Sequence, residues 1–236
     1  MEQRELGASG LRLSLVGLGT NNFGGRIDIE ASRQVIHKAL DVGVTHFDTA
    51  DIYGNSGGSE TVIGEVLGAR RDEVVLATKI GKPMAGVRED HRGSRGYVHR
   101  AVEASLKRLK TDHIDLLYMH EPDPSTPVDE TLRALDELVK TGKLRHVAAS
   151  NYSADEIDAA VKTAKARKIE GFTAAQDEYS LTFRDHETTL FPALERNGLG
   201  LVPYFPLGGG ALTGKYRKGR PLPTGTRHKS GDNRFL

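Results

Sequence analysis

Four side chains capable of acid–base chemistry each come at or just after the end of a short apolar run: Asp48, Tyr53, Lys79 and His120. A phenol is a poor acid at neutral pH because its ordinary pKa is about 10. A nearby ammonium lowers that pKa, and a carboxylate beside the lysine keeps the ammonium charged and aimed. A histidine close to the hydroxyl would orient a carbonyl oxygen. The set suits a reaction in which a carbonyl receives hydride at carbon and a proton at oxygen.

Each of these residues also has an ordinary explanation when it is taken alone. A single histidine is more often structural than catalytic, Lys79 alone would be a solvated loop lysine, and Asp48 alone a turn or cap residue. Their joint placement favours one shared site, because the active sites of parallel barrels lie at the carboxyl ends of the strands. Polar groups follow later runs too, as Ser150 and Asn151 and then Gln176. For these three the alternative is a turn or a satisfied backbone group.

Short apolar runs alternate with longer amphipathic stretches along the whole sequence. The runs are Leu13–Leu18, Val44–Phe47, Val74–Ala77, Ile114–Tyr118, Leu144–Ala149, Phe172–Ala175 and Gly200–Tyr204. This alternation predicts right-handed βαβ units and a parallel sheet in an α/β fold. A closed barrel fits better than an open doubly wound sheet, although periodicity alone does not separate them. We expect one domain over residues 1–236, with an N-terminal hairpin that pairs Arg4–Leu6 with Leu11–Leu13.

Capping residues mark where several of the amphipathic stretches begin. Asp28 precedes the first helical stretch, and Ser153 with Glu156 forms a capping box before a later one. Thr126 followed by Pro127 predicts a cap and a proline at the first helical position of another. These signals predict helices between the strands.

Composition excludes several classes of function. There are 33 basic and 32 acidic residues, so no charge excess draws nucleic acid or an anionic membrane. The chain has no cysteine, which excludes disulfides and thiolate catalysis. The nine histidines show no metal-ligand spacing, so no metal is expected. The sequence shows neither a signal-peptide pattern nor an apolar run of about 18 residues, which predicts a cytoplasmic protein without a membrane span.

Seven segments in a fixed order resemble the aldo-keto reductase superfamily. They are VGLGTNNFGG, FDTADIYG, ATK, YMH, SNYS, Gln176 and YFPLGGGALTGKY. The resemblance is nearest to the branch that includes aryl-alcohol dehydrogenases, aldose dehydrogenases and potassium-channel β subunits. It implies a (β/α)₈ barrel that reduces carbonyl compounds with NADP(H), with NAD(H) as the alternative cofactor. The implied substrate is a small aldehyde, ketone or sugar, or the corresponding alcohol.

The resemblance also implies roles for individual residues. Tyr53 would be the proton donor, Asp48 and Lys79 would tune it, and His120 would orient the substrate carbonyl. The implied cofactor-binding residues are Gly19, Thr20, Asp48, Ser150, Asn151, Gln176, Tyr204, Phe205, Pro206, Leu207, Gly208, Gly210 and Leu212. Among them, Ser150, Asn151 and Gln176 match positions that bind the nicotinamide carboxamide. Tyr204 matches the aromatic residue that stacks on the ring.

The remaining cofactor positions match two loops. Gly19 and Thr20 lie where the first loop of the family approaches the nicotinamide ribose. Leu207 to Leu212 match a loop whose backbone amides approach the pyrophosphate. Phe205 departs from the family, because many relatives have a small polar residue there.

The sequence contains seven apolar runs where the family has eight strands. The residues after Tyr216 resemble the loop that follows the seventh strand, so we expect residues 1–236 to lack the eighth β/α unit and its anchors for the adenosine 2′-phosphate. Because such charge-assisted bonds contribute about 1.5–3 kcal/mol each, weak NADPH binding is expected. Two alternatives to an active enzyme stay open, a cofactor-bound regulatory subunit like the channel β subunits and an inactive fragment of a longer enzyme. The sequence specifies neither the substrate nor the oligomeric state.

Overall fold

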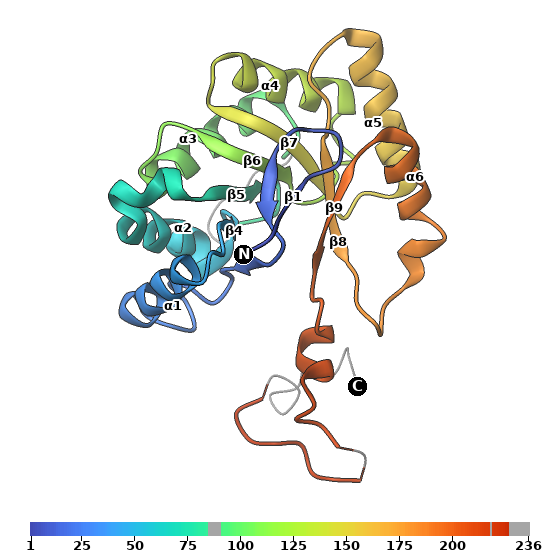
Figure 1. Cartoon of the computed structure of the whole chain (residues 1–236). Helices are drawn as coiled ribbons and strands as arrows, with labels where there is room; N and C mark the ends of the chain where they lie inside the picture. Colours follow the sequence, from blue (N-terminus) through green and yellow to red (C-terminus); the bar gives the residue numbers. More distant parts are fainter. Residues whose placement is uncertain (85–90, 218, 227–236) are drawn as a thin grey trace.

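The computed structural model describes residues 1–84, 91–217 and 219–226. Seven strands form one parallel sheet in chain order: β3 (Gly17–Gly19), β4 (His46–Asp48), β5 (Val75–Ile80), β6 (Ile114–Met119), β7 (Leu144–Ser150), β8 (Ala174–Glu178) and β9 (Gly200–Tyr204). The sheet curls as a partial barrel, and β3 and β9 are its two end strands (Figure 1). The predicted parallel α/β fold is confirmed. The described residues form no eighth strand in this sheet.

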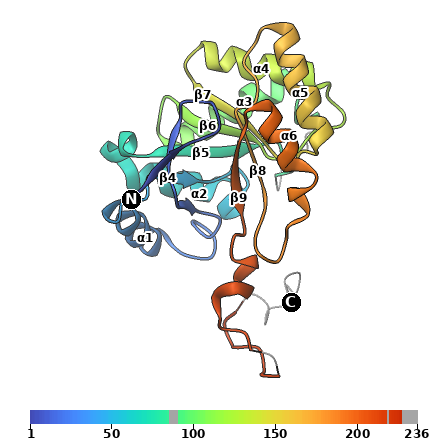
Figure 2. The same ribbon diagram turned by 45° about the vertical axis from the view of Figure 1, so that its right-hand side comes forward.

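Helices cover the outer face of the curled sheet. They are α1 (Ile29–Asp41), α2 (Tyr53–Leu67), α3 (Arg95–Leu109), α4 (Val128–Lys140), α5 (Ala154–Arg167) and α6 (Leu190–Asn197), with 3₁₀ segments η1 (Gly68–Glu73), η2 (Asp185–Glu187) and η3 (Gly208–Thr213). Turning the molecule keeps these helices on the outside of the strands (Figure 2). Side chains of a strand alternate between the helices and the barrel interior. On β5, Leu76 and Ile80 pack in the helix-facing core, whereas Ala77 packs with the interior cluster.

The N-terminal hairpin forms as predicted, with strands shifted by one residue. β1 (Gln3–Glu5) pairs antiparallel with β2 (Arg12–Ser14). The prediction of a single strand over Leu13–Leu18 is wrong, because that run is divided between β2 and β3. Ser14 explains the division: its hydroxyl accepts hydrogen bonds from the amides of Thr45 and His46 just before and at the start of β4, which fixes the chain between the two strands.

Leu6 and Leu13 of the hairpin region are buried against the interior cluster, and this contact anchors the hairpin to the barrel. Gly7 lies at the closest approach. Its φ is +57°, and a Cβ there would stand 2.4 Å from the Gly200 amide nitrogen. Only glycine fits this position without displacing β9.

Two of the three predicted helix caps are confirmed. Asp28 accepts a hydrogen bond from the Ala31 amide at 2.8 Å at the start of α1, and Ser153 and Glu156 form the complete capping box of α5. These bonds satisfy amides that a helix leaves unpaired at its first turn.

The prediction that Thr126 caps α4 is wrong. α4 begins at Val128 after Pro127, and no side-chain bond caps it. The Thr126 hydroxyl donates instead to Asp123 at 2.7 Å. Asp123 also accepts a hydrogen bond from the Ser125 hydroxyl at 2.6 Å. The carboxylate is the stronger acceptor, so it organises this loop as a turn of its own.

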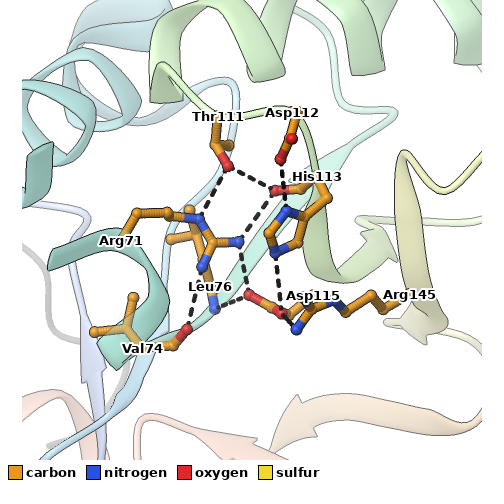
Figure 3. Close-up of polar contacts among 8 residues, drawn as sticks. All are labelled: Arg71, Val74, Leu76, Thr111, Asp112, His113, Asp115 and Arg145. Carbon is orange, nitrogen blue, oxygen red and sulfur yellow. Dashed lines mark hydrogen bonds and ion pairs between the residues drawn. The ribbon is translucent and has the colours of Figure 1, made fainter. Parts of the chain in front are cut away.

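A buried ion network closes the amino-terminal ends of three strands. The Asp115 carboxylate of β6 accepts hydrogen bonds from Arg71 at 2.7 Å, the Leu76 amide at 2.9 Å and Arg145 of β7 at 2.8 Å. Arg71 also donates to the carbonyl oxygens of Val74 and His113. Figure 3 shows these side chains converging on Asp115. No sequence pattern singled out this network, which joins β5, β6 and β7.

In the described part of the chain, no helix combines the length and apolar character needed to cross a membrane.

Candidate active site

An ion pair between Lys79 and Asp48 lies at the carboxyl ends of β4 and β5. The Lys79 ammonium donates to both oxygens of Asp48, at 2.8 and 2.7 Å, and to the Thr49 carbonyl at 2.9 Å. Lys79 is 1% exposed. Burial by itself lowers its pKa, but the Asp48 carboxylate and the Tyr53 phenol outweigh burial and hold the pKa above its ordinary value. The ammonium is therefore a fixed positive charge.

Tyr53 begins α2, and its ring lies against this ammonium. The Lys79 nitrogen is 5.1 Å from the centroid of the Tyr53 ring. Residues 54–57 all have positive φ, so the chain makes a tight left-handed turn directly after the tyrosine. Gly54 is required there, since its φ is +65° and a Cβ would stand 2.4 Å from the Phe23 carbonyl oxygen. The turn fixes where the tyrosine side chain leaves the backbone.

His120 follows β6 and completes the group. Its ring meets the Tyr53 ring edge-on, with 6.0 Å between centroids. Its Nδ1 is buried, and no described residue pairs with it. Burial first, and then the charges of Lys79 and Lys82, lower the His120 pKa to about 2. The imidazole is therefore neutral at physiological pH and acts as a hydrogen-bonding group, not as a cation.

The predicted carboxamide residues form one connected row beside the tetrad. The Gln176 amide nitrogen of β8 donates to Asp48 at 3.1 Å. The Asn151 amide nitrogen donates to the Ser150 hydroxyl at 3.0 Å, and the Tyr204 hydroxyl of β9 donates to the Asn151 amide oxygen at 2.8 Å. A hydroxyl and two amides in a row offer both donors and acceptors. This donor set fits a carboxamide, which itself presents an N–H₂ group and a carbonyl oxygen.

Of the two residues predicted in the first loop, Gly19 faces open space and Thr20 is buried. Gly19 ends β3, and a Cβ there would meet no atom within 4 Å, so the surface above it is open. Thr20 is fully buried, and its hydroxyl and its amide both donate to the Asp48 carbonyl at 3.0 Å. In this structure Thr20 supports the backbone of Asp48.

The other predicted cofactor residues lie at and beyond the carboxyl end of β9, at the start of the segment that ends in η3 (Figure 1): Phe205, Pro206, Leu207, Gly208, Gly210 and Leu212. Three of their amides already donate within the segment, Gly208 to Phe205 at 2.8 Å, and Gly210 and Leu212 to Leu207 at 3.0 and 3.1 Å. Phosphate binding through these amides stays a prediction, and it requires a change in this hydrogen bonding.

A set of buried hydroxyls lies near Asp48, and no sequence pattern predicted it. The Ser59 hydroxyl donates to the Thr20 carbonyl at 2.9 Å and lies 2.9 Å from the Thr49 hydroxyl. All three residues are fully buried. The sequence signal for this set is Thr49, directly after Asp48. Its side chain meets Ser59 of α2, on the helix side of the strand, where a leucine or valine would be usual. The set joins α2 to the ends of β3 and β4.

The parallel sheet therefore brings a phenol, a fixed ammonium–carboxylate pair and a neutral imidazole to one rim. This defines an α/β barrel-type protein with an acid–base site. The sequence model described as "Aldo/keto reductase family" matches residues 15–233. The chain belongs to the aldo/keto reductase family, as the sequence segments indicated.

Three relatives illustrate the range of the family. The chain is 40% identical over 228 residues to the uncharacterized oxidoreductase YrpG of Bacillus subtilis, covering 92% of this chain and 70% of that protein. It is 36% identical over 233 residues to a probable voltage-gated potassium channel subunit beta of Arabidopsis thaliana, covering 96% and 70%. It is 37% identical over 239 residues to the L-glyceraldehyde 3-phosphate reductase of Escherichia coli, covering 98% and 68%. Family and relatives together support a carbonyl-reducing oxidoreductase.

Proposed function

We propose that this protein transfers hydride between NADP(H) and a small aldehyde, ketone or sugar carbonyl, with Tyr53 as the general acid and base. One observation carries the proposal. The Lys79 ammonium is held between both Asp48 oxygens and lies 5.1 Å from the centre of the Tyr53 ring. A buried charge fixed in this position stabilises the negative charge that develops on the Tyr53 oxygen as its proton leaves.

A bound nicotinamide would supply the hydride. Side chains of this protein would donate the proton and orient the carbonyl oxygen of the substrate. Tyr53 gives its hydroxyl proton to the carbonyl oxygen as that oxygen gains negative charge. Neutral His120 donates a hydrogen bond that orients the same oxygen. In the reverse direction the Tyr53 oxygen takes the proton back from the alcohol. The Tyr53 oxygen is therefore the proton donor in carbonyl reduction and the proton acceptor in alcohol oxidation.

The residues proposed to hold the nicotinamide follow from the connected row. Ser150, Asn151 and Gln176 would bind the carboxamide, and Tyr204 would lie against the ring, held by its bond to Asn151. The open surface at Gly19 would admit the ribose. Gln176 also contacts Asp48 directly, so binding of the carboxamide is linked to the tetrad. NADP(H) is proposed over NAD(H) on the family resemblance.

A second candidate function is a cofactor-binding regulatory subunit. Its support is the 36% identity to the plant channel β subunit over 96% of this chain. The comparisons do not discriminate between the two functions, because the chain is 36% identical to the channel β subunit and 37% identical to the reductase.

Oxidation of NADPH, followed by its absorbance with a panel of aldehydes, tests the proposal. Steady aldehyde-dependent oxidation of NADPH is the expected result. Cofactor binding with no turnover of any aldehyde would instead favour the regulatory subunit. Equal rates with both cofactors would remove the proposed preference for NADP(H).

A further inference from the structure

Asp51 is a buried carboxyl group that the tetrad does not use. It lies between Asp48 and Tyr53 in the chain and is 1% exposed. Its amide donates to the Lys79 carbonyl at 3.0 Å. Neither carboxyl oxygen accepts a hydrogen bond from a described side chain; the Ile52 amide is the backbone donor that acts on the group. An ionised carboxylate is costly to bury without a partner, so the uncharged acid is the form of Asp51 that this position favours.

The charges around Asp51 are already paired. Glu60 of α2 is fully buried, and it accepts hydrogen bonds from the Thr78 hydroxyl and from Arg108 of α3, both at 2.6 Å. On the barrel side, Lys79 is paired with Asp48. An ionised Asp51 would therefore add a negative charge that no neighbouring cation balances alone.

The protonation of Asp51 follows from this arrangement. Burial first, and then the Glu60 charge, raise the Asp51 pKa to about 8, against the opposing effects of Arg108, the Ile52 amide and Lys79. Glu60, Arg108 and Lys79 are the charged groups that face it from α2, α3 and β5. At neutral pH the side chain is the uncharged acid, and it loses its proton only in mildly alkaline solution.

We propose that Asp51 is a positioning residue that acts through the charge at Tyr53: as the neutral acid it leaves the field of Lys79 at Tyr53 unopposed, and on losing its proton it slows the reaction. The proposal rests on the proposed function. Two backbone bonds hold this turn, one from Asp51 to Lys79 and one from Tyr53 to Ala50 at 3.1 Å. An added negative charge at Asp51 lies in the field of Lys79 and opposes the negative charge that forms on the Tyr53 oxygen.

The kinetic test compares wild type with Asp51→Asn in NADPH-dependent aldehyde reduction across the alkaline range. In wild type, kcat falls as the pH rises through about 8. The amide of the variant cannot ionise, so this fall disappears, while any decline caused by other groups remains in both proteins. Asp185→Asn, at an exposed position of η2, is the matched control and keeps the wild-type profile. Identical profiles for wild type and Asp51→Asn overturn the proposal.

Urea denaturation provides a second test that needs no activity. The Asp51 pKa is about 8 in the folded chain and 3.8 ordinarily, so between these values folding takes up a proton. The stability that Asp51 contributes at low pH is therefore lost as the pH rises toward 8. The unfolding constant of wild type relative to Asp51→Asn should increase about tenfold per pH unit in this window and level off above it. If the ratio of the two unfolding constants does not change with pH, Asp51 is not protonated in the folded chain at neutral pH.

The outcomes separate this proposal from the proposed function. If no aldehyde is turned over, the proposed function fails and the positioning role fails with it, while denaturation still decides whether Asp51 is protonated. If the denaturation ratio changes with pH but both kinetic profiles are the same, Asp51 is only structural. Glu60→Gln removes the neighbouring negative charge, so it should move the alkaline fall in kcat to lower pH.

Discussion

At the scale of single residues, Lys79 and His120 are both buried, but only Lys79 keeps a charge. Lys79 is buried but paired with Asp48, so it stays charged. His120 is buried next to that cation, and no carboxylate among the described residues pairs with it, so it stays neutral. One fixed charge and one neutral hydrogen-bonding ring therefore surround Tyr53. This division fits the proposal that Tyr53 is the group that carries the proton.

The neutral state of His120 gives a testable pH dependence. Its pKa is lowered to about 2, so the imidazole does not gain a proton between about pH 5 and 8. We expect kcat/KM for carbonyl reduction to show no acidic decline from this residue in that range. His120→Gln should lower kcat/KM by about 10²–10³-fold, the usual effect of losing a donor to a developing oxyanion, and leave the acidic part of the profile unchanged. An acidic decline near pH 6.5 that the variant abolishes would contradict a neutral histidine.

At the scale of elements, the two ends of the parallel strands have different tasks. The carboxyl ends of β4 to β9 carry the candidate site, whereas the amino-terminal ends of β5, β6 and β7 are joined by the network around Asp115 (Figure 3). This separation is usual in barrels, where stability and catalysis reside at opposite ends. Changes in the Asp115 network should therefore alter stability and spare the chemistry.

Asp115→Ala tests this separation. The substitution leaves the largely buried Arg71 guanidinium without its carboxylate, and breaking a buried pair in this way costs about 3–5 kcal/mol. Urea denaturation should register this loss, while turnover per folded molecule stays near the wild-type value. The neighbouring Asp112 is almost fully exposed, so Asp112→Ala should leave the urea midpoint close to the wild-type value. Equal losses for the two variants would show that the buried network is not a main support of the strands.

At the scale of the whole molecule, the sequence predicted the parts that depend on local pattern. Alternating periods predicted most of the strands and the helices, and the residues at strand ends predicted four side chains that lie together at one rim. The division of Leu13–Leu18 was missed because Ser14 forms bonds to a strand some thirty residues later. The setting of Asp51 was missed for the same reason, because the charges that act on it, Glu60, Arg108 and Lys79, come from three separate elements. Such contacts exist only after the chain has folded.

Comparison of Tyr53→Phe with wild type tests whether Tyr53 is the proton donor. The variant should lose at least about 10²-fold in kcat for aldehyde reduction, the usual contribution of a general acid, because it has no proton to give. NADPH affinity, measured by fluorescence titration, should stay near the wild-type value because the ring remains. Tyr179→Phe, which removes a hydroxyl bonded to Glu187, is the matched control and should keep full activity. If Tyr53→Phe retains most of the wild-type turnover, Tyr53 is not the proton donor.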